Sequence, residues 1–392
     1  MFSNIPFSKK IHLLIVDFWI NQLNFWLSFF QKIFFRKIKT APQNILIYKI
    51  GNIGDIVCAI PAFIAIRRAY PMAKITLLTS PGKRGALGAK ELLDRAWYLD
   101  ELKVYYAEDL DSFDKKKIFI RDLKRNNYDL FIQLPDDLAN FRILFRNMTF
   151  AKLIGVKSAI GFKIRTIQLF KKTQVDYSAN KTEAESLLDI LYENDIYESK
   201  VEFDFNIADN QKNKVKTALK EKWGEISKDD IIIAISAGGK RETSQWPKER
   251  FREVAEYLCK KYNVKIIIVG GRADVSRAKL IAQNLKNEDY LIVAGELEIL
   301  ETAELLKSCS FLISNSTGII HLAAAVDLPA IGIYSIRDVF GRWFPYGKNH
   351  KILYHKFLNC DYKNENCVKK SIEMISVEEI KIACDTVIKK IN

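Results

Sequence analysis

Several features typical of common enzyme classes are missing from this chain. It has only four histidines and six cysteines, and the cysteines show none of the paired spacings of a zinc site. No Asp-x-Asp motif follows a predicted strand, so we expect neither a metal nor another cofactor. The glycines form neither the three-glycine dinucleotide fingerprint nor a P-loop that ends in Lys-Ser or Lys-Thr.

Low-complexity tracts and internal repeats are also absent, which argues against disordered and solenoid classes. The composition, 48% hydrophobic and 28% charged, is that of a globular chain with a sizeable core, and 392 residues favour two domains. The N-terminal region lacks the pattern of a secretory signal, so we expect a cytoplasmic protein with free thiols. Cys360 and Cys367, in a polar loop, form a pair that oxidising conditions can bridge.

The net charge of +14 raises the question of a nucleic-acid partner. Because the basic residues are spread along the chain and interleaved with 47 acids, no compact basic stripe with stacking aromatics is present, and we expect no nucleic acid. An anionic membrane surface or a phosphorylated partner explains the charge more simply. Lys83 and Arg84, after a predicted strand, and Arg142 with Arg146 are candidate contacts for such a partner. The alternative for each is solvated surface.

Short apolar runs separated by helical patterns recur along both halves of the chain, as in parallel sheets with connecting helices. The predicted strands are Ile45–Ile50, Lys74–Thr79 and Leu130–Leu134 in the first half, and Ile231–Ser236, Lys265–Val269, Tyr290–Val293, Phe311–Ser314 and Ala330–Tyr334 in the second. Helices are expected at Ala62–Ala69, after Pro247, and after a capping box formed by Ser376 and Glu379. The polar stretch Asp204–Lys212 predicts a domain boundary.

A helix start with a polar cluster lies late in the chain, at SNSTGIIHLAAA from 314 to 325. It follows the apolar run Phe311–Ile313, so the first N–H groups of the helix, at Ser316, Thr317 and Gly318, are expected at a sheet edge. Such N–H groups lack helical partners and favour an anion, for which a diphosphate is well suited. Thr317 and His321 share one helix face. The alternative is an ordinary N-cap with a packed core histidine.

A glycine turn follows the first predicted strand, at GNIGD from 51 to 55. Gly51 and Gly54 permit a close approach of the backbone to a ligand or a neighbouring strand. Asp55 falls at the carboxyl edge of that strand, where open α/β sheets bind their ligands. It is therefore a candidate general base, and its alternative role is to cap the following helix.

These two motifs and a third, AGGKRETSQWP from 237 to 247, resemble those of glycosyltransferase family 9, whose best-known members are the lipopolysaccharide heptosyltransferases. The resemblance covers residues 43 to 350. It implies a GT-B fold, an α/β architecture in which two Rossmann-like domains face each other across a cleft. It also implies inverting, metal-independent transfer of a sugar from a nucleotide-diphosphate donor to a lipopolysaccharide or other lipid-linked acceptor.

Roles for individual residues follow from this resemblance and from the local patterns. Asp55 is expected to act as the base, because one carboxylate is enough to take a proton from an acceptor hydroxyl. The expected donor-binding residues are Ser316, Thr317, Gly318, His321, Gly238, Lys240 and Arg241, with Asp274 accepting from a ribose hydroxyl. The expected acceptor-binding residues are Asn52, Lys83, Arg84 and Arg142.

The chain departs from the family pattern at two positions that help to hold the donor in heptosyltransferases. It has Ser316 where the family usually has Asp, and Ser244 where it usually has Lys. Lys240 or Arg241 is expected to supply the missing charge, and the transferred sugar, the nucleotide and the acceptor stay open. Two alternatives to a transferase are a GT-B-shaped epimerase acting on a free nucleotide sugar and a catalytically silent nucleotide-sugar binding protein.

The first forty residues belong to neither predicted domain; the expected division is 1–40, 41–205 and 206–392, with the last helix either in the third segment or packed back on the second. From Ile11 to Phe35 the chain carries eight Phe and Trp residues, while polar residues recur at helical spacing. This pattern predicts an amphipathic helix that lies on a membrane, since the polar residues make a span costly. The first forty residues contain six basic residues and one acid, which favours the anionic inner face of the cytoplasmic membrane. The alternative is a helix packed on the first domain or in a dimer interface.

Overall fold

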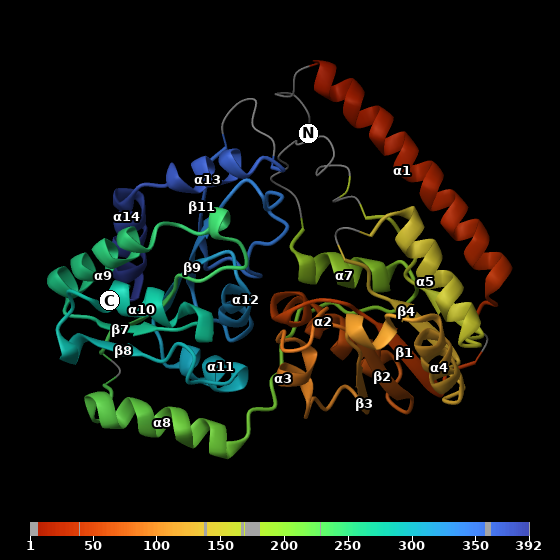
Figure 1. Cartoon of the computed structure of the whole chain (residues 1–392), viewed down its shortest axis with the longest axis horizontal. Helices are drawn as coiled ribbons and strands as arrows, with labels where there is room; N and C mark the ends of the chain where they lie inside the picture. The colour runs from red at the N-terminus through yellow and green to blue at the C-terminus, as the bar shows by residue number, and fades with distance from the viewer. Residues whose placement is uncertain are drawn as a thin grey trace. The chain divides into compact units, whose positions relative to one another are not determined.

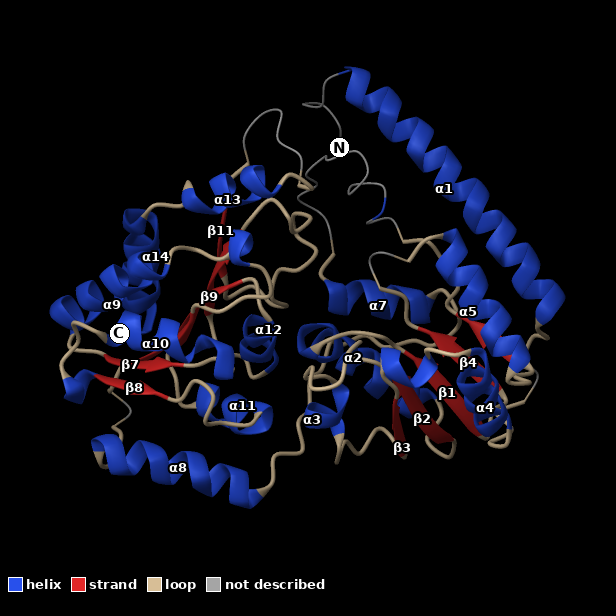
Figure 2. Cartoon of the chain, in the orientation of Figure 1, coloured by secondary structure: helices blue, strands red, loops and turns tan. Residues whose placement is uncertain are grey.

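The chain forms two α/β units, Met1–Asp204 (unit 1) and Phe205–Asn392 (unit 2), each built on one parallel sheet (Figures 1 and 2). The structure is a computed structural model and describes residues 7–38, 40–136, 139–165, 168, 181–227, 229–356 and 362–391. The strand order is β3-β2-β1-β4-β5 in unit 1 and β11-β10-β9-β6-β7-β8 in unit 2. Both are Rossmann orders, in which ligands bind where the strand order reverses. That point lies between β1 and β4 in unit 1 and between β6 and β9 in unit 2.

Unit 1 begins with a long helix and continues as strands joined mainly by helices. Its elements are α1 (Phe7–Phe34), β1 (Asn44–Tyr48), α2 (Ile53–Ala69), β2 (Lys74–Thr79), α3 (Ala89–Leu93), β3 (Glu101–Val104), η1 (Ala107–Leu110), α4 (Phe113–Lys124), β4 (Leu130–Gln133), α5 (Phe141–Leu153), β5 (Ser158–Ile160) and α7 (Glu183–Tyr192). Ile45, Leu46 and Ile47 of the central strand β1 are fully buried. A strand that is buried on both faces must be apolar throughout, which explains the continuous apolar run.

Unit 2 repeats this pattern. Its elements are α8 (Asp209–Trp223), β6 (Ile232–Ser236), η2 (Glu242–Ser244), α9 (Lys248–Tyr262), β7 (Lys265–Ile268), η3 (Arg272–Asp274), α10 (Val275–Ala282), η4 (Asn287–Asp289), β8 (Tyr290–Ile292), α11 (Ile299–Lys307), β9 (Phe311–Asn315), α12 (Gly318–Ala325), β10 (Ala330–Tyr334), β11 (Lys351–Tyr354), α13 (Glu365–Glu373) and α14 (Val377–Ile391). Trp246 is fully buried and packs edge-on against Phe251. Helix α14 packs on α9 within unit 2.

The predicted strands are confirmed to within two residues at each end, and the predicted Ala62–Ala69 helix is the second half of α2. The capping box before α14 is also confirmed, because Glu379 accepts from the Ser376 N–H at 2.8 Å and the Glu379 N–H donates to the Ser376 hydroxyl at 3.2 Å. The sequence patterns do not predict β3, β5 or β11, each of which is an edge strand of its sheet.

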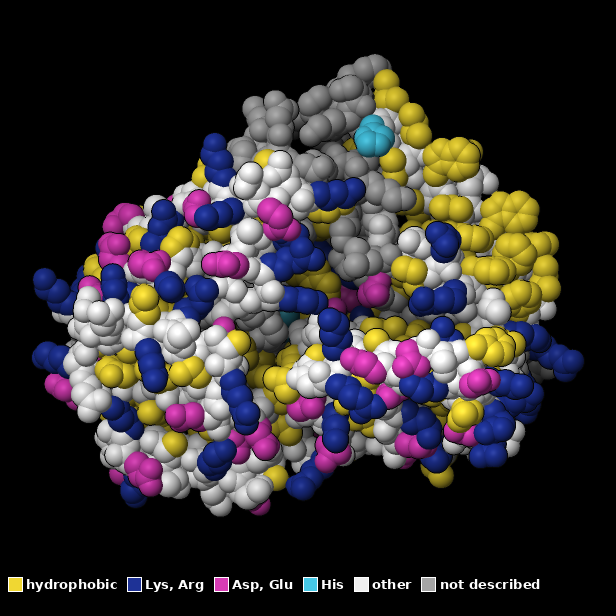
Figure 3. Space-filling model, viewed as in Figure 1, with side chains coloured by type: hydrophobic (Ala, Val, Ile, Leu, Met, Phe, Trp, Pro, Cys, Tyr) yellow, Lys and Arg dark blue, Asp and Glu magenta, His cyan; other side chains and the backbone are white. Residues whose placement is uncertain are grey.

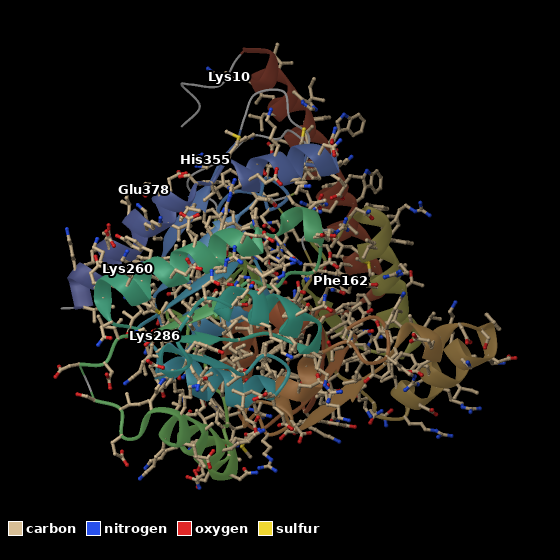
Figure 4. All side chains as sticks on the ribbon, turned by 60° about the vertical axis from the view of Figure 1, so that its left-hand side comes forward. Lys10, Phe162, Lys260, Lys286, His355 and Glu378 are labelled. Carbon is tan, nitrogen blue, oxygen red and sulfur yellow. The ribbon has the colours of Figure 1, made fainter. Side chains whose placement is uncertain are left out.

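The predicted N-terminal helix is present as α1 and lies along the edge strand β5 of unit 1. Asn24 exchanges two hydrogen bonds with the backbone of Ile164, at 2.7 and 3.0 Å, and Gln31 donates to the carbonyl of Ala159 in β5 at 2.9 Å. The chain just after α1 is anchored by Phe35, which stacks on Phe162, labelled in Figure 4. Asn24 and Gln31, two polar residues of α1, therefore contact the rest of unit 1 and satisfy backbone groups of β5 and of the segment that follows it.

The cysteines only partly follow the expectation of free thiols. Cys58, Cys259, Cys309 and Cys384 are not in disulfide bonds. Cys367 is disulfide-bonded, so the expectation is wrong for that residue. Cys360, the other member of the predicted pair, lies outside the described residues.

Candidate active site

The glycine turn of unit 1 lies at the carboxyl end of β1, next to the point where the strand order reverses. Asp55 is in the first turn of α2, and its carboxylate accepts from the N–H of the N-cap residue Asn52 at 2.9 Å. A Cβ atom on residue 51 would lie 2.2 Å from the Asp55 Cβ, so Gly51 is required for the turn to pack against this side chain. Asp55 thus has the capping role that was its alternative, and its side chain stays half-buried at the sheet edge.

A buried cluster of charges that the sequence analysis missed lies beside this turn. The ammonium of Lys49 is 3.3 Å from a carboxylate oxygen of Glu183, and the guanidinium of Arg165 donates to the same carboxylate at 2.7 Å. Burial lowers the pKa of Lys49, while the nearby Asp55 opposes the shift. Lys49 was recognisable from the sequence as a charge at the end of an apolar strand, but its partners come from distant segments.

The predicted acceptor residues are placed on loops that follow adjacent strands. Asn52 follows β1, Lys83 and Arg84 follow β2, and Arg142 lies in the first turn of α5 after β4. Lys83 and Arg142 are exposed, whereas Arg84 is ion-paired with Asp109. Because β2, β1 and β4 are neighbours, these residues share one edge of the sheet.

A pocket of about 120 Å³ opens at the reversal point of unit 1. Its lining includes the polar residues Gln133, Asp136, Arg146 and Asn147. Asn147 donates to the Gln133 side chain at 3.1 Å and accepts from Arg146 at 3.2 Å. The pocket therefore has a polar side within a mixed lining, and it lies beside the Asp55 turn because β1 and β4 are paired.

The second predicted cluster lies at the reversal point of unit 2. Helix α12 begins directly after β9, with Thr317 as its N-cap, and Ser316, Thr317 and Gly318 are half-buried. Asn315, at the end of β9, is fully buried and holds the neighbouring loop, since its amide donates to the carbonyls of Ala237 and Gly238 at 2.8 and 3.1 Å. Its oxygen accepts from the Trp246 N–H at 3.0 Å. Asn315 therefore positions the loop after β6 against the start of α12, a role that the sequence analysis did not assign.

His321, one turn into α12, is 6% exposed and packs edge-on against Trp343 with the ring centroids 6.0 Å apart. Burial, and to a smaller extent the neighbouring His350, lowers the pKa of His321 to about 4. The imidazole is therefore neutral at pH 7 and can form a hydrogen bond with an anion but cannot neutralise it. Both predicted roles, packed histidine and member of the polar cluster, are compatible with this placement.

Gly238 and Asp274 are brought together by the adjacent strands β6 and β7. A Cβ on residue 238 would lie 2.4 Å from the Asp274 carboxylate, so only glycine fits there. The same carboxylate accepts from the Gly271 N–H at 2.9 Å. Asp274 thus lies next to the loop that follows β6.

The cations near Ser244 differ from the expected ones. Lys240 and Arg241 are both exposed, and Arg241 is ion-paired with Glu365 at 3.3 Å. Ser244 itself accepts from Arg337, whose Nε lies 3.0 Å from the hydroxyl oxygen. Arg337 follows β10 and has no sequence signal that links it to the site.

Comparison with known proteins identifies the family. The model of glycosyltransferase family 9 (heptosyltransferase) matches residues 117–373. The chain belongs to glycosyltransferase family 9. Lipopolysaccharide heptosyltransferase 1 of Escherichia coli O18:K1:H7 is 23% identical to this family member over 84% of the chain and 97% of the relative.

Solved structures agree with the fold. The glycosyltransferase family 9 protein of Veillonella parvula superposes with a TM-score of 0.71 at 18% identity, over 91% of this chain and 100% of that one. The E. coli ADP-heptose lipopolysaccharide heptosyltransferase II gives 0.62 at 15% identity, over 88% and 99%. The predicted family and the GT-B type fold, with its two Rossmann-like units and N-terminal apolar helix, are confirmed. This chain is a glycosyltransferase of that family, which favours the predicted activity over an epimerase or a catalytically silent binding protein.

Proposed function

We propose that this glycosyltransferase moves a sugar from a nucleotide-diphosphate donor to lipopolysaccharide or another lipid-linked acceptor, with inversion and without a metal. The observation that carries the proposal is the start of α12, where polar N–H groups, Asn315 and the β6 loop meet at the reversal point of the unit 2 sheet. The chain is similar to heptosyltransferases over most of its length, and this similarity supports a donor such as ADP-heptose.

In this proposal unit 2 binds the donor. The N–H groups at Ser316, Thr317 and Gly318 bind the diphosphate, because a helix N-terminus combines N–H groups that lack helical partners with the positive end of the helix dipole. Thr317 and the neutral His321 donate further hydrogen bonds. Asp274 accepts from a ribose hydroxyl, since its carboxylate lies beside Gly238 at the neighbouring strand end.

Unit 1 supplies the base and binds the acceptor. Asp55 takes the proton from the acceptor hydroxyl while that oxygen forms a bond to the anomeric carbon. The bond from this carbon to the diphosphate oxygen breaks at the same time, and the nucleoside diphosphate leaves with the electron pair. Preorganised N–H donors stabilise the charge that develops on the leaving group. We expect the acceptor at the pocket that Arg146 lines, with Asn52, Lys83, Arg84 and Arg142 on the same sheet edge.

The proposal places the enzyme on the inner face of the cytoplasmic membrane. Part of the α1 surface that does not pack on the rest of unit 1 is apolar and exposed. It includes Phe18, Trp19 and Phe25, which are 57%, 60% and 62% exposed. Figure 3 shows hydrophobic side chains gathered over this helix. Lys10–Phe34 is also long and apolar enough to cross a membrane, by length and composition alone, and an 18-residue stretch within it has a mean hydropathy of 1.3. We favour an interfacial position because Asn24 and Gln31 are already bonded to unit 1.

The test is a screen of ADP-, GDP-, UDP-, CDP- and dTDP-sugars for thermal stabilisation, followed by product analysis. A ligand at about 100 times its dissociation constant should add roughly 2.7 kcal/mol to stability. Transfer is then measured by mass spectrometry with a lipopolysaccharide acceptor and the best donor. Conversion of the donor to an epimer without acceptor would indicate the epimerase, and donor binding without turnover would indicate the silent binding protein.

A further inference from the structure

Arg337 and Ser244 connect the two loops on either side of the start of α12. Ser244 ends η2 in the loop after β6, and Arg337 lies in the loop after β10. Strands β6 and β10 flank β9, and β9 leads into α12. The hydrogen bond from the Arg337 Nε to the Ser244 hydroxyl, at 3.0 Å, therefore joins the loops on both sides of the strand that carries the Ser316 to Gly318 N–H groups.

Arg337 shares its carboxylate partner with a second guanidinium group. Glu365, at the start of α13, accepts from Nη2 of Arg337 and is also ion-paired with Arg241 at 3.3 Å. Two guanidinium groups thus share one carboxylate, for a formal charge of +1. The Nη1 group of Arg337 has no hydrogen-bond partner within the described part of the chain, although a guanidinium carries five N–H donors.

Arg337 is better placed than Arg241 to act on a bound anion. The side chain of Arg337 is 22% exposed, against 57% for Arg241, so solvent and salt screen its charge less. A planar guanidinium can also bind two phosphate oxygens at once. Its attachment to Ser244 brings a cation to the position where the family usually has Lys.

We infer that Arg337 binds the donor diphosphate and replaces, from a different loop, the cation that Ser244 lacks. This inference rests on the proposed function and adds a residue to its donor site. It replaces Lys240 and Arg241 as the main source of positive charge. It also predicts that Ser244→Lys can supply the positive charge in place of Arg337, because a Lys at position 244 would reach the same region from the β6 loop.

The test compares nucleoside diphosphates with their monophosphates by calorimetry, using whichever of ADP, GDP, UDP, CDP and dTDP binds the full chain most tightly. Arg337→Met should weaken the diphosphate by about 10- to 100-fold, since hydrogen bonds to charged groups are lost, and should leave the monophosphate nearly unchanged. Arg241→Met is the matched control, because it removes the other cation that pairs with Glu365, and its effect should stay within about twofold. Adding Ser244→Lys to Arg337→Met should restore diphosphate affinity.

Glu365→Gln separates binding from support of the loop. If Arg337 binds phosphate, loss of the competing carboxylate should keep or raise the affinity for the nucleoside diphosphate. If Arg337 only holds α13 against the β6 loop, Glu365→Gln should lower that affinity. Equal losses for the diphosphate and the monophosphate, or no loss in Arg337→Met, would overturn the assignment while leaving the donor site in place. If the wild-type chain binds no nucleoside diphosphate, the proposed function and the role of Arg337 are both wrong.

Discussion

Membrane binding by α1 is testable through two of its exposed aromatic residues. We expect Phe18→Ser together with Trp19→Ser to reduce binding to acidic vesicles, since these residues are 57% and 60% exposed in the absence of a membrane. An aromatic side chain presents roughly 150–250 Å², so the two exposed portions amount to about 200 Å². At about 25 cal/mol per Å² their complete removal from water contributes about 5 kcal/mol. Insertion of half this area still gives about 2.5 kcal/mol, or a roughly 70-fold loss of partitioning in the double variant.

The assay is cosedimentation of the full chain with vesicles that contain anionic lipid. Phe113→Ser is the matched control, because Phe113 is 80% exposed but lies on α4. High salt should weaken binding only in part, since it screens about 1 kcal/mol for each of Lys32, Arg36 and Lys37 and leaves the apolar contribution. The membrane assignment is wrong if the wild-type chain does not sediment with vesicles, or if the double variant sediments as the wild type does.

Three further predictions concern the two units. Asp55→Asn should lower turnover by about 10²–10⁴-fold with donor affinity retained; steady-state kinetics and calorimetry test this, and full activity would remove Asp55 as the base. His321 has a folded pKa of about 4, below its unfolded value, so the unfolded chain binds more protons between about pH 6.5 and pH 4. The free energy of unfolding should therefore decrease as the pH is lowered from about 6.5 to about 4, and it should decrease less in His321→Asn. Urea-denaturation free energies that depend on pH in the same way in both proteins would contradict this. Glu183→Gln leaves two buried cations without their shared carboxylate and should cost about 3–5 kcal/mol in urea denaturation, whereas a loss below about 1 kcal/mol would mean that water compensates them.

The strands that the sequence misses all lie at a sheet edge, whereas those that it predicts are interior strands apart from β8. β1, β6 and β9 are interior strands whose apolar runs are buried on both faces, so hydrophobicity alone locates them. β3 alternates charged and apolar residues, and β5 has only three residues. Both lie at an edge, where one side of the backbone is unpaired by other strands. Such strands are defined by their partners, which a single segment does not reveal.

The candidate site shows the same limit. Asp55, Thr317 and His321 could be predicted because each lies beside a glycine turn or a helix start, where local chemistry indicates a ligand. Asn315 could be located but not interpreted, since its role depends on the carbonyl of Ala237 far away in the sequence. The contact between Arg337 and Ser244 spans 93 residues and carries no local signature at all.

The docking of α1 on the β5 edge has a consequence for the synthesis of the chain. Asn24 bonds to Ile164, which is 140 residues later, so at about 5–20 residues per second the helix leaves the ribosome roughly 7–28 s before its partner exists. During that interval the aromatic residues of α1 are exposed to solvent or to a membrane surface. Until those partners are made, Asn24 and Gln31 lack the backbone groups that they bond in the folded chain, and together with the other polar residues of α1 they make stable insertion as a membrane span less favourable.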